Sequence, residues 1–189
     1  ANEHLILATA SRLFAEQSIN DVTMSAIAAA AGIGKGTLYR AFANKGELCL
    51  ALMDDDLRLF QEETFDLLNE RMLSRPLEAL AEFLHRMVIF MGAHAAYMCE
   101  AEANGLLHGR SEINQTSLHE WFRLTVLLLL QRAAAVGEVS GSANMDYLAD
   151  VVLAPLNPRL IRYQLEEQGM AIDVLSEQLV RFVMNGVAG

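Results

Sequence analysis

Cysteine and proline are both scarce in this chain, and each scarcity excludes a class of structure. Two cysteines, Cys49 and Cys99, in 189 residues cannot form the disulfide framework that holds small secreted domains together. We therefore expect a protein of a reducing compartment, the cytoplasm. All three prolines lie after residue 75, so no proline interrupts a helix before that point.

Long apolar runs are missing as well. One of the longest runs of large apolar side chains is Val126 to Leu130, and it ends at Gln131. A membrane-spanning helix needs about 20 apolar residues, so no membrane span is expected. Charged or polar residues at Glu3, His4 and Arg12 interrupt the start of the chain, which argues against a signal peptide. The chain starts with alanine rather than methionine, so whether a basic N-terminal arm precedes Ala1 stays open.

Positive charge is scarce too, and the net charge of −10 taken alone argues against nucleic-acid binding. Its distribution weakens that argument. Up to residue 50 the charges balance, with Arg12, Lys35, Arg40 and Lys45 against Glu3, Glu16, Asp21 and Glu47. All of the excess negative charge lies after residue 50, and both lysines of the chain lie before it. An acidic body with a neutral, locally positive head fits a protein that directs one end toward DNA.

Three short helices are predicted in the first 42 residues. Apolar side chains recur on one helix face at Ile6, Ala10, Leu13 and Phe14, and again at Met24, Ile27, Ala28 and Ala31. Thr23 lies where an N-cap belongs, and Gly32 lies where a helix commonly ends. A third helix is expected from about Lys35 to Phe42. Two helices joined by a glycine-containing turn indicate a helix-turn-helix, whose second helix enters the major groove of DNA.

The rest of the chain shows helical periodicity and no alternation typical of strands. Asn44 and Glu47 form a capping-box pattern, which predicts a long helix reaching about residue 73. Further helices are expected at about 76–91, 96–107, 116–136, 144–168 and 173–186. Pro155 and Pro158 should bend or break the helix at 144–168. The fold class is therefore all-α, with about nine helices in total.

A set of residues between Ile6 and Met53 follows one fixed spacing: Ile6, Ala10, Leu13 to Glu16, Val22-Thr23, Ile27-Ala28, Ala31 to Ile33, Lys35 to Tyr39, Phe42, Asn44-Lys45 and Glu47-Leu48. This set resembles the DNA-binding head of the TetR (tetracycline repressor)/AcrR-type family of bacterial transcriptional regulators. Two positions depart from the family pattern. Gly34 stands where serine is frequent, and Ala41 stands where tyrosine or histidine is frequent.

The resemblance implies a helix-turn-helix DNA-binding domain at 1–46 and a helical-bundle effector-binding and dimerisation domain at 47–189. It implies a cytoplasmic, nucleoid-associated homodimer, paired through the last two helices at about 144–168 and 172–187. Such a protein binds a near-palindromic, double-stranded operator and is usually a repressor released by a small lipophilic effector. The alternative is a helical ligand-binding or interaction protein whose DNA-binding head is weak or silent.

Seven residues of the head are predicted to contact DNA: Thr23, Lys35, Gly36, Thr37, Tyr39, Arg40 and Lys45. Those from Lys35 to Arg40 lie on the expected recognition helix, where Gly36 would let the backbone approach DNA closely. Thr23 and Lys45 lie at helix N-termini, which favour phosphate. A solvated surface remains the alternative for the charged residues, packing for Tyr39 and a plain N-cap for Thr23.

Eight soft or aromatic residues form the predicted effector pocket: Phe83, Met87, Phe90, Met91, Tyr97, Met98, Trp121 and Phe122. Methionine and aromatic side chains suit an adaptable lipophilic site, although ordinary core packing explains any one of them. Glu82 and His85 have the spacing of a di-iron motif, but that chemistry needs a second copy and further carboxylates. No enzyme activity, metal or cofactor is therefore expected.

Overall fold

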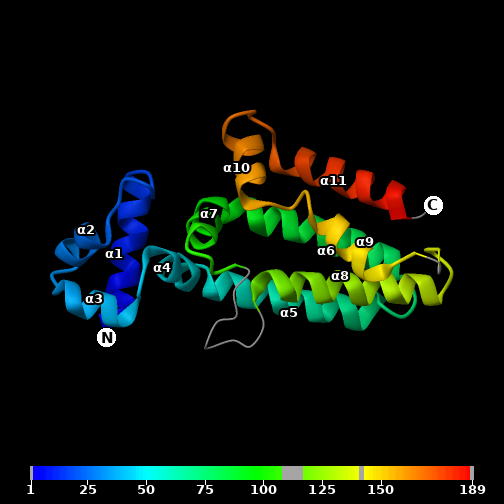
Figure 1. Ribbon diagram of the computed structural model, residues 1–189, viewed down its shortest axis with the longest axis horizontal. Coiled ribbons are helices and arrows are strands. Elements are labelled where there is room, and N and C mark those ends of the chain that lie inside the picture. Colours follow the sequence, from blue (N-terminus) through cyan, green and yellow to red (C-terminus); the bar gives the residue numbers. More distant parts are fainter. Residues whose placement is uncertain (1, 108–116, 141–142, 188–189) are drawn as a thin grey trace.

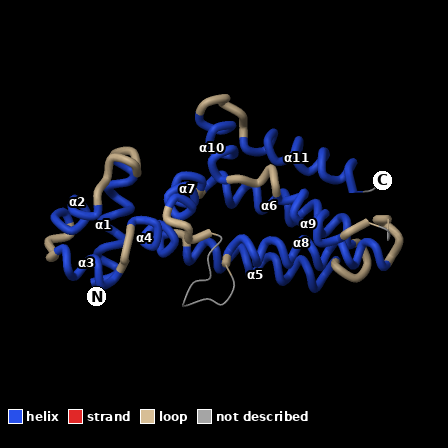
Figure 2. The backbone as a smooth tube through the Cα atoms, viewed as in Figure 1, coloured by secondary structure: helices blue, strands red, loops and turns tan. Residues whose placement is uncertain are grey.

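The computed structural model describes residues 2–107, 117–140 and 143–187, and within these ranges every regular element is a helix (Figures 1 and 2). The helices are α1 (Asn2–Glu16), α2 (Met24–Ala30), α3 (Lys35–Ala41), α4 (Lys45–Leu52), α5 (Asp54–Arg71), α6 (Pro76–Ala93), α7 (Ala95–Ala103), α8 (Leu118–Ala135), α9 (Met145–Leu153), α10 (Pro158–Glu166) and α11 (Ile172–Val187). The all-α prediction is confirmed. The count exceeds nine because two of the predicted helices are each divided in two.

Helices α1, α2 and α3 form a small bundle at one end of the molecule (Figure 1). Their apolar side chains form one hydrophobic cluster with three residues outside these helices, Val22, Phe42 and Leu48. The members on the helices are Ile6, Ala10, Leu13, Met24, Ile27, Ala28 and Leu38. Thr23 caps α2 as predicted, because its Oγ1 accepts a hydrogen bond from the backbone N–H of Ala26 at 3.1 Å. Gly32 has a φ of 67°, and the N–H of Ile33 bonds to the carbonyl of Ala28 at 3.0 Å. The chain therefore turns sharply between α2 and α3.

The helix predicted from residue 44 to about residue 73 is wrong as a single helix, because it divides at Met53 into α4 and α5. Its predicted start is confirmed, since the side chain of Asn44 accepts a hydrogen bond from the N–H of Glu47 at 2.9 Å. Three aspartates at positions 54–56 occupy the first turn of α5. Aspartate is unfavourable inside a helix but stabilises its first turn, where its charge meets the positive end of the helix dipole. This run therefore favours a new helix start.

Helix α6 is the centre of the larger bundle, with α5, α8, α10 and α11 all packed against it. An aromatic cluster joins α5, α6 and α8 around Phe60. Its ring centroid lies 5.0 to 6.2 Å from the centroids of Phe83, Phe90, Trp121 and Phe122. These separations are those of packed aromatic pairs, so the cluster anchors the three helices to one another.

The two late prolines divide the predicted helix at 144–168, as expected. Helix α9 ends at Leu153, and α10 begins at Pro158 after Asn157, whose side chain accepts hydrogen bonds from two backbone N–H groups. Several large apolar side chains on α9, α10 and α11 stay exposed: Tyr147, Val151, Leu160, Tyr163, Val174 and Phe182. Among the described residues, no helix has the length and apolar character needed to cross a membrane.

Candidate functional site

Helix α3 is short, and its attachment to the head determines which of its side chains face solvent. Leu38 is fully buried and Phe42 nearly so, which fixes the inner side of the helix against α1 and α2. Gly34 is the N-cap of α3 and makes no side-chain cap, so the hydroxyl common in the family has no substitute here. The helix is held in place mainly by burial of its apolar side.

The outer side of α3 brings together most of the predicted DNA contacts. Lys35, Gly36, Tyr39 and Arg40 are exposed, and Thr37 is half-buried. The Arg40 side chain lies along the helix, where its Nε donates to the carbonyl of Gly36 at 3.2 Å and its Nη2 to Thr37 Oγ1 at 3.4 Å. Among the described contacts, neither Lys35 nor Arg40 pairs with a carboxylate. This surface therefore offers two cations and a tyrosine hydroxyl to solvent.

Gly36 lies in this exposed surface, and no close contact with the described part of the chain requires a glycine there. A Cβ built at this position meets no atom within 4 Å. Glycine inside a helix costs about 0.5–1 kcal/mol relative to alanine. The absence of a side chain there therefore relieves no steric contact among the described residues.

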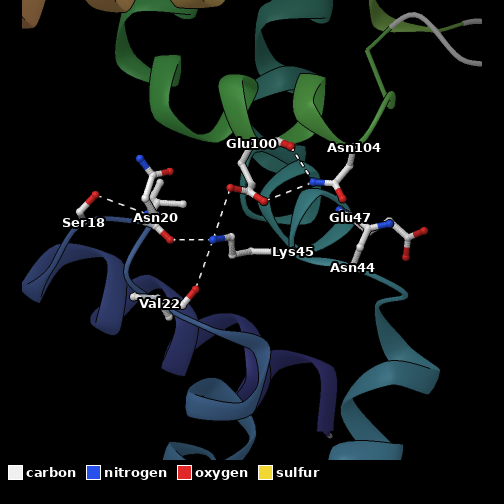
Figure 3. A network of polar contacts seen from close by, with 9 residues as sticks. Ser18, Asn20, Val22, Asn44, Lys45, Glu47, Glu100 and Asn104 are labelled. Carbon is white, nitrogen blue, oxygen red and sulfur yellow. Dashed lines mark hydrogen bonds and ion pairs between the residues drawn. The ribbon is translucent and has the colours of Figure 1, made fainter.

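Lys45 does not join this surface (Figure 3). Its Nζ donates to the carbonyls of Ile19 at 2.8 Å and Val22 at 3.2 Å, and it lies 3.4 Å from Glu100 Oε2. The Lys45 side chain is 16% exposed. Thr23 stays exposed, but its oxygen serves as the N-cap of α2. The geometry therefore does not support Lys45 as a phosphate ligand.

A cavity of about 280 Å³ lies among α6, α7, α8, α9 and the start of α10. Its apolar lining consists of Met91, Met98, Leu107, Leu118, Phe122, Leu153, Ala154, Leu156 and Pro158. Three of the eight predicted pocket residues, Met91, Met98 and Phe122, are among them. No pattern in the sequence indicates the wall formed by residues 153–158. Ordinary leucine, alanine and proline become pocket residues only through the packing of α9 beside α8.

The other five predicted pocket residues lie elsewhere. Phe83, Met87 and Phe90 are buried in the core, and Trp121 packs against the aromatic cluster. Tyr97 faces the head, where its ring centroid lies 5.9 Å from that of Phe14 on α1. These residues support the cavity or the junction with the head, and they do not line the cavity.

The polar rim of the cavity has its charges paired. Glu102 Oε2 accepts a hydrogen bond from Arg159 Nε at 2.9 Å, and Glu102 Oε1 accepts one from Asn157 at 3.4 Å. Asp150 Oδ1 accepts one from Arg123 Nε at 2.7 Å. Each of these two carboxylates therefore has a guanidinium partner among the described residues.

Metal and thiol chemistry find no support in the geometry. Within the described ranges, no three or more His, Cys, Asp or Glu side chains gather to hold a metal ion. His85 Nδ1 lies 2.6 Å from Ser176 Oγ, and Glu82 accepts a hydrogen bond from Arg86 at 2.6 Å. Burial raises the pKa of the Cys49 thiol to about 12, helped by the nearby Glu100 carboxylate. This thiol is therefore protonated and unreactive at neutral pH.

Comparison with known proteins finds a family match for the head. Residues 6–52 match the model of the family described as bacterial regulatory proteins, tetR family. An HTH-type transcriptional regulator of Staphylococcus aureus strain MRSA252 is 25% identical over 188 residues, which cover 98% of this chain and 94% of that regulator. The likeness to a named regulator thus extends over both the head and the body.

Solved structures share the complete fold. The ketosteroid transcriptional regulator KstR2 of Mycobacterium tuberculosis has a TM-score of 0.69 and 19% identity, covering 99% of this chain and 95% of its own. Thermus thermophilus FadR, a TetR-family transcriptional repressor solved in complex with lauroyl-CoA, has a TM-score of 0.67 and 16% identity, covering 97% and 94%. At these identities the likeness establishes the fold, and the ligand of each relative remains its own.

The helix-turn-helix of α2 and α3, the family match over residues 6–52 and the shared fold of the whole chain agree with one another. The relatives with these features are transcriptional regulators and not enzymes. The head of the chain, residues 6–52, therefore matches the tetR family of bacterial regulatory proteins, and the whole chain is similar in fold to the transcriptional regulators named above.

Proposed function

We propose that this regulator is a repressor that binds a near-palindromic operator as a homodimer and leaves it when a small lipophilic molecule binds. The exposed face of α3 is the observation that carries the proposal. It combines two cations without carboxylate partners, Lys35 and Arg40, with the open backbone at Gly36. These are the features that a recognition helix needs to approach bases and phosphates. Tyr39, 49% exposed, would add a phosphate contact, and Thr37 and Thr23 would contribute their hydroxyls.

The exposed apolar side chains of α10 and α11 support a dimer through the last helices. Phe182 is 75% exposed, and Leu160, Tyr163 and Val174 lie between 41% and 51%. Both helices lie on one outer side of the body (Figure 1). Apolar area of this kind is unfavourable in water and is typical of a subunit interface. A two-fold pair would place two α3 helices in successive major grooves, about 34–36 Å apart.

The cavity beside Met91, Met98 and Phe122 supports a lipophilic effector. Its volume of about 280 Å³ lies near the lower end of ligand sites, which span roughly 300–1,000 Å³. Among the described rim residues, Arg159 and Arg123 are already paired with Glu102 and Asp150, so neither guanidinium is left free for a polyanionic head group. We therefore infer an uncharged ligand for this site, in contrast to the lauroyl-CoA bound by the Thermus relative.

Helix α7 is the element through which this ligand would act on the head. Met98 and Glu102, one helical turn apart, line the cavity, while Tyr97 and Glu100 on the opposite side of α7 contact the head. Helix α4 packs closely against α7. A ligand that favours another position of α7 would thereby change the position of the head, and operator binding would weaken by the same coupling factor.

The two hydrophobic clusters suggest a boundary between the DNA-binding domain and the effector domain. The hydrophobic cluster of the head includes Leu48 and reaches Ala51 and Leu52 at its edge, and Met53 belongs to the cluster of the body. We therefore place the division between the DNA-binding domain and the effector domain at the α4–α5 break, a few residues beyond 46/47. A regulator of this kind would act in the cytoplasm, where its operator lies.

Selection of bound fragments from random double-stranded DNA tests sequence-specific binding. At about 50 mM salt one near-palindrome should be enriched, and its affinity should fall steeply toward about 200 mM, because phosphate contacts release counterions. Lys35→Met should lower the salt slope by about one. Arg132→Met, on the exposed body end of α8, is the matched control and should leave the slope unchanged. Folded, dimeric protein that enriches no sequence would refute the DNA-reading proposal.

Gly36→Ala separates stability from DNA binding. Because the added methyl meets no atom of the protein, the free energy of unfolding in urea should rise by about 0.5–1 kcal/mol. Operator affinity should fall on the order of tenfold, since the methyl would occupy space needed for the DNA backbone. Unchanged affinity in a titration with the selected fragment would show that DNA does not approach residue 36 closely.

Phe182→Glu tests the dimer interface by sedimentation equilibrium. Placing a charge on this exposed apolar position should raise the dimer dissociation constant by about 30-fold or more, as for a central interface residue. Phe65→Glu is the matched control, since Phe65 is 59% exposed on α5, away from the proposed interface. Equal behaviour of the two variants would place the dimer contact outside α10 and α11.

Ala154→Trp tests the cavity, because the larger ring would occupy its volume. The uncharged dye N-phenyl-1-naphthylamine should bind the unchanged protein with saturable fluorescence, and lauroyl-CoA should compete poorly. The substitution should weaken dye binding on the order of tenfold or more, while Ala135→Trp, exposed on α8 and outside the cavity, should not. Strong competition by lauroyl-CoA would contradict the uncharged class of ligand.

A further inference from the structure

The ammonium group of Lys45 joins three segments that are distant in sequence (Figure 3). It donates to the carbonyls of Ile19 at 2.8 Å and Val22 at 3.2 Å in the turn between α1 and α2, and lies 3.4 Å from Glu100 Oε2 on α7. Lys45 itself is the first residue of α4. One side chain thus contacts the head, the connecting helix and the body.

Two hydrogen bonds and one ion pair surround the group. A lysine ammonium has three N–H donors, and three oxygens surround this one. The Lys45 and Glu100 side chains are 16% and 17% exposed. Charges with so little water around them depend on each other, and removing one leaves the other poorly solvated. A contact between Lys45 and a DNA phosphate would require this arrangement to be broken.

The surroundings hold Glu100 and the start of α4 in register. Asn104 Nδ2 donates to the backbone carbonyl of Glu100 at 2.8 Å and to its Oε1 at 3.2 Å. Next to Lys45, a Cβ on Gly46 would lie 3.0 Å from Asn104 Cβ and 3.0 Å from Leu106 Cδ1. The absence of a side chain at Gly46 therefore lets α4 approach the end of α7 closely enough for the ion pair to form.

We propose that Lys45 and Glu100 are positioning residues that fix the head to α7, and that Lys45 does not contact DNA. The pair holds the turn before α2, so it helps set the orientation of α2 and α3 relative to the body. Glu100 is on the helix whose other side lines the cavity, so the pair also lies on the route between ligand and operator. The expected effects of this pair on operator binding rest on the proposed function, whereas its structural link between head and body does not.

Operator titrations across salt concentrations distinguish positioning from phosphate contact. Lys45→Met and Glu100→Gln should each weaken binding on the order of tenfold, with the salt slope unchanged. The double variant should bind no more weakly than either single variant, because both remove the same link. Lys35→Met is the lysine control and should lower the slope by about one. Glu70→Gln, exposed on α5, controls for the loss of one negative charge.

Hydrogen exchange without DNA tests the link independently of operator binding. In the full-length protein, Lys45→Met and Glu100→Gln should both accelerate amide exchange in residues 19–28, while exchange in the core of α6 stays unchanged. Glu100→Gln keeps the size of the side chain and its contact with Asn104, so it remains informative if Lys45→Met does not fold. Lys35→Met should leave exchange at 19–28 unchanged.

Two results would overturn the proposal. In the first, Lys45→Met lowers the salt slope by about one and its effect adds to that of Glu100→Gln, as expected for an independent phosphate contact. In the second, exchange at 19–28 is the same in both variants as in the unchanged protein. If no operator is found but exchange accelerates as expected, the proposed function fails and the link between head and body stands.

Discussion

The packing of α4 against α7 is the contact on which the placement of the DNA-binding head depends. Helix α4 is short, and Gly46, Leu48 and Cys49 on it are buried. Leu48 belongs to the hydrophobic cluster of the head, whereas the Gly46 side of the same helix meets the end of α7. Two bundles with separate cores are thus held together by a helix that serves both. Because interfaces of packed side chains have a few discrete arrangements and are not freely deformable, a shift of α7 would change the head position as a unit.

The charge distribution distinguishes the head from the body. The body holds the excess negative charge of the chain and would be repelled by DNA, so the head is the end that DNA would meet. Within the head, Arg12 pairs with Glu16 on α1, and Lys45 turns inward. Lys35 and Arg40 on α3 are left to provide the positive surface. With so few cations, DNA binding would depend more on a close approach of the DNA backbone to Gly36. Few other charged contacts would compensate for a poor fit there.

The cavity and the aromatic cluster illustrate how one set of side chains divides into two roles. Phe60, Phe83 and Phe90 pack against each other and give α5 and α6 a rigid contact. Met98 and Phe122 stand at the border of this core and line open volume. A packed aromatic base fixes the helices that frame the cavity, while methionine can adapt its shape to a ligand. Selectivity would then come from the rim, where paired charges disfavour a strongly anionic ligand.

Local rules in the sequence determined the helices, the caps at Thr23 and Asn44, the turn at Gly32 and the break at the late prolines, since each depends on neighbours within a few residues. The family pattern over the first quarter of the chain determined the helix-turn-helix for the same reason. Only the tertiary structure decided the direction of Lys45, because its partner Glu100 is brought near by the packing of α4 on α7. It also decided which apolar residues line a cavity and which fill the core. A methionine or leucine obeys the same helical periodicity in either place, and only the distance between packed helices separates the two.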